Sequence, residues 1–430
     1  MTKILELDYK GEIIKGPLLK EDETYFMIKL SSGYNANLKK SNCKIISEQE
    51  IEEKKKFGNV TDVKTYLNES KELPKITILH TGGTIASKVD YRTGAVSSKF
   101  TPLEILDLFP ELGEIANVSA KMIANIFSED MRFAEYNLLL NQIKTAIEEK
   151  TDGIIISHGT DTLHYTSAAL QYAIKNLSVP VILVGAQRSS DRASSDAFSN
   201  LTAAAEFIIQ NKKETLNFNR VGICMHETIN DDSYLILDGI NAKKMHSTKR
   251  DAFKQINYKP YCRINLFKNN EFEILRPELQ TIKPIKELKI TEYKEDLKIG
   301  FFKIHPNMFD WELDHLINYN AAIIEGTGIG NLPENNDNSK KDKLILNKLH
   351  EICDKTKIFA GTQTVYGEIS LDIYSRGRDI QESGIIGNRT NLTTESTFCR
   401  VAYCLSQTEK SFDDSWLENL EGFDLISKNN

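Results

Sequence analysis

Threonines and glycines follow two short apolar runs of this 430-residue chain. The run KITIL at 75–79 leads into HTGGT, which ends at Thr84, and the run GIIIS at 153–157 leads into HGTDT at 158–162. A threonine hydroxyl acts as a nucleophile only when a nearby base accepts its proton. Glycines beside it let the backbone approach a ligand closely. Both motifs therefore indicate a site for hydrolysis or acyl transfer.

The positions of the motifs follow from the scaffold that the hydrophobic pattern predicts. Short apolar runs at 75–79, 153–157, 179–184 and 220–225 are typical of buried strands, and longer amphipathic segments separate them. Such alternation predicts a mostly parallel sheet flanked by helices, an α/β fold. Ligands of parallel sheets bind at the carboxyl ends of the strands, which is where both motifs lie.

Two of the amphipathic segments are clear enough to give helix faces and a helix start. The segment 132–150 spaces its apolar residues at helical intervals, at Tyr136, Leu139, Leu140, Ile143 and Ile147. The segment that follows 179–184 predicts a second helix with Ser195 as its N-cap.

The same pattern suggests how the chain divides into domains. We expect a small β-barrel-like domain at 1–52, because short alternating runs are separated there by turn residues. A charged linker follows at 53–74, and a large α/β domain with the threonine motifs occupies 75–270. A connector rich in Lys, Glu and Pro at 271–296 leads to a smaller α/β domain at 297–430.

Composition excludes several classes of function. The net charge of −7 offers no general attraction for nucleic acid, so such contact would need a local patch or a partner. The N-terminus is charged, and no apolar run approaches the ~20 residues of a membrane span, so we expect a cytoplasmic protein with no membrane contact. Six scattered cysteines without a C-x-x-C pair indicate free thiols.

Other catalytic and binding motifs fit poorly. GTGIGN at 326–331 imitates a dinucleotide fingerprint but has Asn331 where the last glycine belongs. The chain has no Gly-Lys pair, no G-x-S-x-G and no H-E-x-x-H, which disfavours a Walker loop, a serine hydrolase and a metal site. Each threonine motif taken alone is more often a turn or a helix cap than a nucleophile.

Taken together, the motifs carry a family resemblance. TGGTIA and HGTDT, with NIFSEDM at 125–131, GINAKKMHSTKRDAFK at 239–254 and EGTGIGNLP at 325–333, resemble the L-asparaginase/glutaminase family of threonine amidohydrolases. The resemblance covers roughly residues 75 to 425 and implies that family's two-domain α/β fold.

The resemblance also implies catalytic roles. Thr84 matches the first nucleophilic threonine, and Thr160 with Asp161 matches the second threonine and its acidic neighbour. Lys244 matches the lysine that completes a Thr-Lys-Asp relay, and Tyr91 the tyrosine that closes over the nucleophile. A lysine can accept a hydroxyl proton only in its neutral form, so we expect Lys244 to gate protons through Thr160 and Asp161.

Substrate binding is implied at four further positions. Ser128 matches the serine that grips the substrate's α-carboxylate, while Glu129 and Asp161 are expected to bind its α-ammonium. Backbone N–H groups around Gly83 and Gly159 would stabilise the oxyanion. Many free-standing family members have glutamine after the gripping serine, so Glu129 is a departure from their pattern.

That departure, the N-terminal β-module and three basic segments resemble one branch of the family, the D subunits of archaeal glutamyl-tRNA(Gln) amidotransferases. The segments are GAQRSSDR at 185–192, KMHSTKRDAF at 244–253 and YSRGRD at 374–379. The resemblance implies glutamine hydrolysis at Thr84 and passage of the ammonia to an E subunit, in an assembly of two D and two E chains. The partner would use ATP and Mg²⁺ to amidate glutamyl-tRNA(Gln), and this chain would need no cofactor.

Alternatives remain at this level. The five basic residues that could face a partner could equally be solvated surface charge; they are Arg188, Arg192, Lys249, Arg250 and Arg376. The protein could be a stand-alone asparaginase, which would turn over asparagine without a partner or tRNA. It could also be a non-catalytic scaffold that binds an amino acid as a signal, although the retention of Thr84, Thr160, Asp161 and Lys244 disfavours this.

Overall fold

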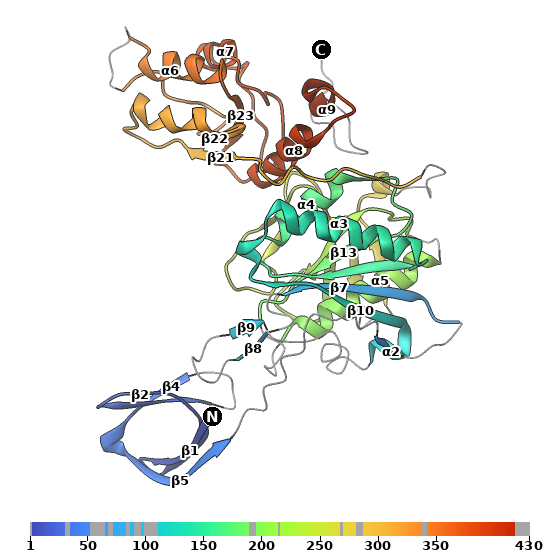
Figure 1. Cartoon of the computed structure of the whole chain (residues 1–430), viewed down its shortest axis with the longest axis vertical. Coiled ribbons are helices and arrows are strands. Elements are labelled where there is room, and N and C mark those ends of the chain that lie inside the picture. Colours follow the sequence, from blue (N-terminus) through green and yellow to red (C-terminus); the bar gives the residue numbers. More distant parts are fainter. Residues whose placement is uncertain are drawn as a thin grey trace.

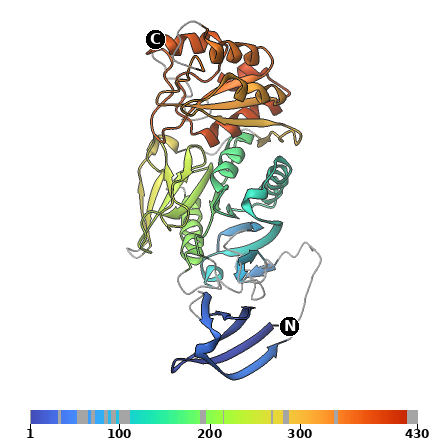
Figure 2. The same ribbon diagram turned by 90° about the vertical axis from the view of Figure 1, so that its left-hand side faces the viewer.

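The computed structural model has three sheet-containing regions, arranged in chain order along its longest axis (Figure 1, Figure 2). It describes residues 2–30, 35–51, 65–67, 72–82, 87–89, 96–98, 111–188, 195–213, 216–266, 270–280, 287–336 and 342–417.

The N-terminal region is an antiparallel sheet in the order β4-β3-β2-β1-β5. Alternate residues such as Leu5 and Leu7 point to a small core that also contains Phe26, Ile28 and Leu38. Its elements are β1 (Thr2–Tyr9), β2 (Glu12–Glu21), β3 (Tyr25–Lys29), β4 (Asn35–Lys39), the 3₁₀ turn η1 (Lys40–Asn42) and β5 (Cys43–Ile51).

The central region is built on a sheet in the order β19-β18-β15-β14-β13-β11-β7-β10-β6. The five neighbouring strands β14, β13, β11, β7 and β10 are parallel. The antiparallel strand β6 lies at one side of them, and the antiparallel-paired strands β15, β18 and β19 lie at the other. The strands are β6 (Thr65–Leu67), β7 (Lys75–Gly82), β10 (Asn117–Ile126), β11 (Gly153–Ser157), β13 (Val181–Val184), β14 (Val221–His226), β15 (Ser233–Asp238), β18 (Cys262–Asn265) and β19 (Glu271–Ile274).

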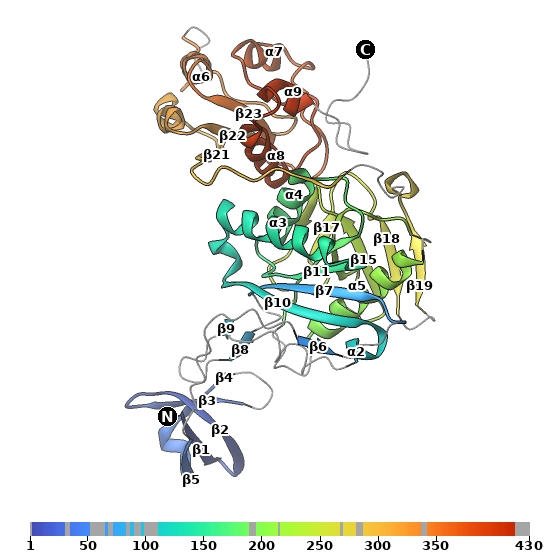
Figure 3. The same ribbon diagram turned by 45° about the vertical axis from the view of Figure 1, so that its right-hand side comes forward.

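Helices cover both faces of this sheet (Figure 3). Side chains alternate across the fully buried strand β11, so Ile154 and Ile156 join the core under α3 and α4, while Ile155 joins the core under α5. The helices are α2 (Leu112–Ile115), α3 (Phe133–Glu148), α4 (Leu163–Ala173) and α5 (Ala197–Lys212), with 3₁₀ turns η3 (Ser128–Asp130) and η4 (Pro277–Leu279). The expected α/β fold with a mostly parallel sheet flanked by helices is thus confirmed.

Two details of these helices differ from the sequence-based expectation. The N-cap of α5 is Asp196 and not Ser195, because the helix begins one residue later, at Ala197. The Asp196 carboxylate accepts backbone N–H groups from Gln187 and Arg188 and so ties the helix start to the loop after β13. The buried face of α3 ends with Ala146, and Ile147 is only partly buried against the core.

Three small two-stranded ladders accompany the large sheet. One of them is a hairpin that brings Lys244 into the central region. The ladders pair β8 (Ser87–Val89) with β9 (Val96–Ser98), β12 (Ile174–Lys175) with β20 (Lys289–Ile290), and β16 (Ala242–Lys244) with β17 (Phe253–Gln255).

The C-terminal region contains a parallel sheet in the order β21-β22-β23 with helices around it. Helix α8 returns to the central region, where Cys399, Val401 and Tyr403 join the core that lies under α3 and α4. The elements are β21 (Ile299–Lys303), η5 (Asp310–Asn318), β22 (Ala321–Gly326), α6 (Leu344–Cys353), β23 (Lys357–Thr362), α7 (Ser375–Glu382), α8 (Thr394–Ser406) and α9 (Phe412–Leu417). Among the described residues, no helix is long and apolar enough to span a bilayer.

The central strand β11 gives a direct test of this packing. Ile156 is fully buried, so Ile156→Ala should lower the free energy of unfolding by about 3–4 kcal/mol through lost burial and the cavity left behind. Ile229 is 64% exposed, and Ile229→Ala should change that free energy by less than about 0.5 kcal/mol. Urea denaturation of both variants measures the difference, and equal losses would contradict the assigned core.

Candidate active site

The candidate site lies where the strand order of the large sheet reverses. From β7 the chain passes to β10 on one side, and it then crosses to β11 on the other. All three strands run parallel, so their carboxyl ends meet at one edge; in register, Gly82 of β7 lies beside Ile126 of β10, and His80 of β7 beside Ser157 of β11. Crevices at such reversals are the usual ligand sites of parallel sheets.

The end of β7 is shaped by a glycine. Gly82 has a φ of +110°, and a Cβ there would collide with the backbone of Ile126 on β10. Only glycine accepts both constraints without strain, so the first glycine of TGGT closes β7 against β10. The next residues, Gly83 and Thr84, lie outside the described residues, as does Tyr91.

The end of β10 presents Ser128 as the first residue of η3. Ser128 is 5% exposed, and a Cβ at Gly159 would lie 2.7 Å from the Ser128 Cβ and 2.9 Å from its Oγ. Thr162 also donates its hydroxyl to the Ser128 carbonyl at 2.6 Å. The HGTDT turn and Ser128 therefore share one wall, and Glu129 beside them is exposed.

The end of β11 carries Thr160 and Asp161, and both contact Lys244. The Lys244 ammonium donates to Thr160 Oγ1 at 2.8 Å and to Asp161 Oδ1 at 2.7 Å. Thr160 is 7% exposed, and the side chains of Lys244 and Asp161 are 9% and 68% exposed. A largely buried cation is thus held between a buried hydroxyl and a solvated carboxylate, at hydrogen-bond distances suited to proton transfer.

The neighbouring lysine has a different partner. Side chains alternate along β16, and Lys243 forms an ion pair with Glu395 at the start of α8. Glu395 also lies 4.0 Å from the His164 ring. Sequence reasoning missed this cluster, because Lys243 and Glu395 are separated by 152 positions and only Lys244 of the KK pair was assigned a role.

Two buried histidines stiffen the strand ends. His158 donates Nδ1–H to the Gly159 carbonyl at 2.7 Å, and its Nε2 lies 2.9 Å from the Thr166 hydroxyl. His80 packs 2.5 Å from Ser157 Oγ. Burial lowers the pKa of His158 to about 4 and that of His80 to about 3, so both rings are neutral at neutral pH.

The basic residues expected to face a partner differ in their surroundings. Arg188 and Lys249 are exposed, and Arg376 lies 3.6 Å from Glu334 with half of its side chain exposed. Arg250 is different, because its side chain is 15% exposed and pairs with Asp231 at 2.7 Å. The expectation that Arg250 faces outward is therefore wrong. Arg192 lies outside the described residues.

No group of three or more His, Cys, Asp or Glu side chains in the described part of the chain is arranged to hold a metal ion.

Comparison with known proteins gives this geometry a family context. Residues 75–279 match the N-terminal domain of the asparaginase family. The chain is 35% identical to the D subunit of the glutamyl-tRNA(Gln) amidotransferase of Pyrococcus furiosus, over 94% of this chain and 87% of that one. It is also 35% identical to the corresponding protein of Methanococcus maripaludis, over 99% of this chain and 95% of that one.

Solved structures agree on the fold. The thermostable L-asparaginase from Thermococcus kodakarensis superimposes with a TM-score of 0.69 at 25% identity, covering 83% of this chain and 100% of that one. L-asparaginase I from Vibrio cholerae superimposes with a TM-score of 0.67 at 24% identity, covering 81% of this chain and 98% of that one.

The buried His158 predicts an acid-sensitive fold. Its pKa is about 4 in the folded chain and about 6.5 when exposed, so the unfolded chain binds more protons between these values. The free energy of unfolding should therefore fall by about 3 kcal/mol from this residue alone as pH falls from 6.5 to 4. Urea denaturation across this range should show a shallower decline for His158→Gln.

His350 is an exposed histidine of α6 and provides the matched control. His350→Gln should keep the wild-type dependence on pH. If both variants follow the same curve as the wild type, the neutral, buried state of His158 is refuted.

Proposed function

We propose, because this chain belongs to the family of glutamyl-tRNA(Gln) amidotransferase D subunits, that it hydrolyses the side-chain amide of glutamine and supplies ammonia to a partner protein. The released ammonia would convert glutamate attached to tRNA(Gln) into glutamine for translation. The observation that carries this proposal is the contact of Lys244 with both Thr160 and Asp161.

The contact supports a role in proton transfer. In its neutral form, the Lys244 amine can accept a proton directly from a hydroxyl 2.8 Å away, and Asp161 lies 2.7 Å from the same nitrogen. We assign Thr160, Asp161 and Lys244 the role of taking a proton from the attacking oxygen and returning one to the leaving amine.

The chemistry proceeds in two balanced steps. In the first, the Thr84 hydroxyl attacks the amide carbonyl carbon, its proton passes to the leaving nitrogen, and ammonia departs as the C–N bond breaks. In the second, water attacks the resulting ester, and glutamate leaves as the Thr84 hydroxyl is restored. We propose that backbone N–H groups at Gly83 and Gly159 bind the oxyanion of both tetrahedral intermediates, and that Tyr91 covers the nucleophile.

Substrate binding falls to the end of β10. Ser128 is held against Gly159 with its carbonyl fixed by Thr162, so its hydroxyl has a defined place for the α-carboxylate of glutamine. The exposed carboxylates of Glu129 and Asp161 offer charge-assisted bonds to the α-ammonium. Binding therefore uses the end of β10 together with Asp161 after β11, and Asp161 also belongs to the proton-transfer group with Thr160 and Lys244.

The synthetic half of the reaction belongs to the partner in this proposal. An E subunit, in an assembly of two D and two E chains, would bind ATP and Mg²⁺, activate the glutamyl group and hold most of the tRNA. This chain would need no cofactor of its own. It would act in the cytoplasm, together with its tRNA.

A coupled assay tests the function. The purified chain is mixed with glutamine, with and without the E subunit and glutamyl-tRNA(Gln), and ammonia release is measured. We expect release to rise at least about tenfold when the E subunit and the charged tRNA are both present, because uncoupled hydrolysis would waste glutamine. Steady turnover of asparagine by the chain alone, at a rate equal to or above the coupled glutamine rate, would identify a stand-alone asparaginase instead.

Lys244 provides a test of the mechanism. Lys244→Met keeps the length of the side chain but removes the proton acceptor, so kcat for glutamine hydrolysis should fall about 10³-fold. Lys254 lies on the facing strand β17 of the same hairpin, with 37% of its side chain exposed, and Lys254→Met should keep kcat within about twofold. Equal activity of the two variants would remove Lys244 from the reaction.

A further inference from the structure

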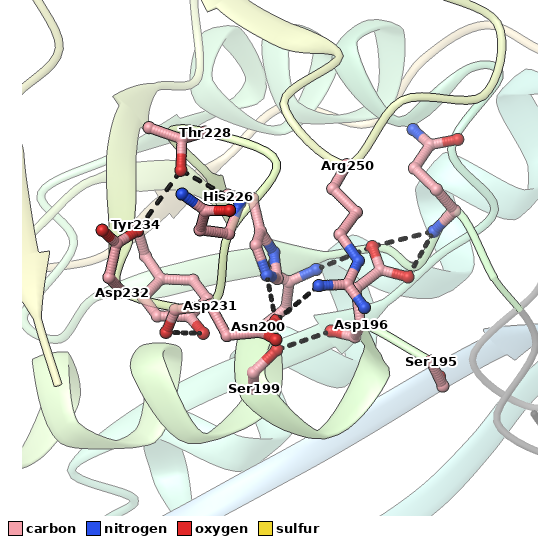
Figure 4. A network of polar contacts seen from close by, with 12 residues as sticks. Ser195, Asp196, Ser199, Asn200, His226, Thr228, Asp231, Asp232, Tyr234 and Arg250 are labelled. Atoms are coloured by element: carbon pink, nitrogen blue, oxygen red, sulfur yellow. Dashed lines mark hydrogen bonds and ion pairs between the residues drawn. The ribbon is translucent and has the colours of Figure 1, made fainter. Parts of the chain in front are cut away.

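A chain of polar contacts links Asn200, His226, Asp231 and Arg250 (Figure 4). It begins at the loop after β13, passes through α5, the end of β14 and the loop before β15, and ends at the hairpin that carries Lys244. None of its members touches the substrate in the mechanism above.

The first link packs against Thr160. A Cβ at Gly185 would lie 2.6 Å from Thr160 Cγ2, so the backbone at 185 fits directly against the threonine's methyl group. Asn200 of α5 is fully buried and donates its Nδ2–H to the Gly185 carbonyl at 3.0 Å. Asn200 therefore holds the backbone that packs against the Thr160 methyl group.

The second link is His226 at the end of β14. Its Nδ1 lies 2.7 Å from Asn200 Oδ1, and its Nε2 lies 3.0 Å from Asp231 Oδ1. The ring is fully buried and packs edge-on against Tyr234, whose hydroxyl donates to the Asp231 carbonyl at 3.0 Å. His226 thus fixes Asn200 and Asp231 at a set separation.

The third link reaches the hairpin. Arg250 donates to Asp231 Oδ1 at 2.7 Å. Burial lowers the pKa of His226, while the nearby carboxylates of Asp231 and Asp196 oppose that effect. The guanidinium of Arg250 is the permanent cation on Asp231.

The hairpin needs such an anchor. Residues 245–249 of its connecting loop are all exposed. Thr248 and Lys249 bond locally, donating their backbone N–H groups to His246 Nδ1 at 3.0 and 3.1 Å. Arg250 follows immediately and is directed inward, so it fixes the loop that leads back to β17, the strand paired with Lys244.

We propose that four residues act as positioning residues: Arg250, Asp231, His226 and Asn200. They hold the β16–β17 hairpin that carries Lys244 in a fixed position relative to the Gly185 backbone that packs against Thr160, so that Lys244 and Thr160 stay at proton-transfer distance. The inference rests on the proposed hydrolysis. Displacement of a reacting group by about 1 Å can cost about 100-fold in rate, so a loosened hairpin should slow the chemical step. Ser128 and Glu129, which are proposed to bind the substrate, follow β10 in η3 and do not belong to this network.

The test is kinetic and uses the chain together with its E subunit and glutamyl-tRNA(Gln). Arg250→Gln should lower kcat for glutamine hydrolysis about 10- to 100-fold while KM stays within about threefold. Arg250→Lys retains a cation at this position and should recover at least part of the loss. Arg263→Gln is the matched control, because Arg263 bridges Glu227 and Glu273 on the same sheet without joining this network; its kcat should stay within about twofold.

A second variant approaches the same contact from the other side. Asp231→Asn keeps the shape of the side chain at a position 51% exposed to solvent, and it should reduce kcat in the same direction even if Arg250→Gln fails to fold. The double variant should be no slower than the slower single variant, because both changes remove the same ion pair between Arg250 and Asp231. Circular dichroism and the thermal midpoint identify the folded variants.

The outcomes separate this inference from the proposed function. Absence of glutamine hydrolysis by the wild-type assembly defeats the function itself. An active wild type, with folded Arg250→Gln and Asp231→Asn variants that match Arg263→Gln, overturns the positioning role alone. Additive losses in the double variant, or losses confined to KM, overturn it as well.

Discussion

The site depends on one contact, the hydrogen bond from the Lys244 ammonium to the Thr160 hydroxyl. The two residues lie 84 positions apart, so the chain must close a large loop before the contact can form. A largely buried ammonium is costly unless it is paired. Asp161 supplies the pairing from a position that is 68% exposed, and water therefore continues to solvate the carboxylate while the lysine is held in the protein. The arrangement keeps the cation in place without burying both charges.

The surrounding fold brings the residues of the site to one edge of the large sheet. Three parallel strands deliver Gly82, Ser128 and Thr160 to one edge, at the reversal of strand order where parallel sheets usually bind their ligands. The tight fits at Gly82 and Gly159 leave no room for a side chain, so the walls approach to contact distance. The neutral, buried His158 then fixes the turn by donating to the Gly159 carbonyl. Apolar cores on both faces of the sheet hold these ends rigidly.

Sequence reasoning reached the features that are encoded locally and missed those that depend on distant partners. The spacing of apolar residues predicted the α/β alternation, and the motifs after the apolar runs predicted Thr160 and Asp161 at the end of a strand. Both features are determined by residues that are close together in the sequence. The antiparallel half of the sheet was harder to predict. The segment 227–232 between β14 and β15 is too short for a parallel crossover, but this can be recognised only when the ends of both strands are known. Ser195 has the right chemistry for an N-cap and its hydroxyl accepts the Ala197 N–H, but the helix begins one residue later than expected, with Asp196 as its N-cap. Arg250 resembled surface charge until Asp231 was placed beside it.

Lys243 and Lys244 illustrate how one element serves two regions. Adjacent residues of a strand point to opposite sides, so Lys244 turns to Thr160 and Lys243 turns to Glu395 of α8. A shift of one residue in the pairing of β16 with β17 that brought Ala242 to the position of Lys243 would leave Glu395 without a lysine. Glu395 is 13% exposed, so its pairing with Lys243 penalises such a slip strongly. The ion pair at α8 therefore helps to select the register that gives the site its lysine, and the C-terminal region contributes to the chemistry without reaching the threonine.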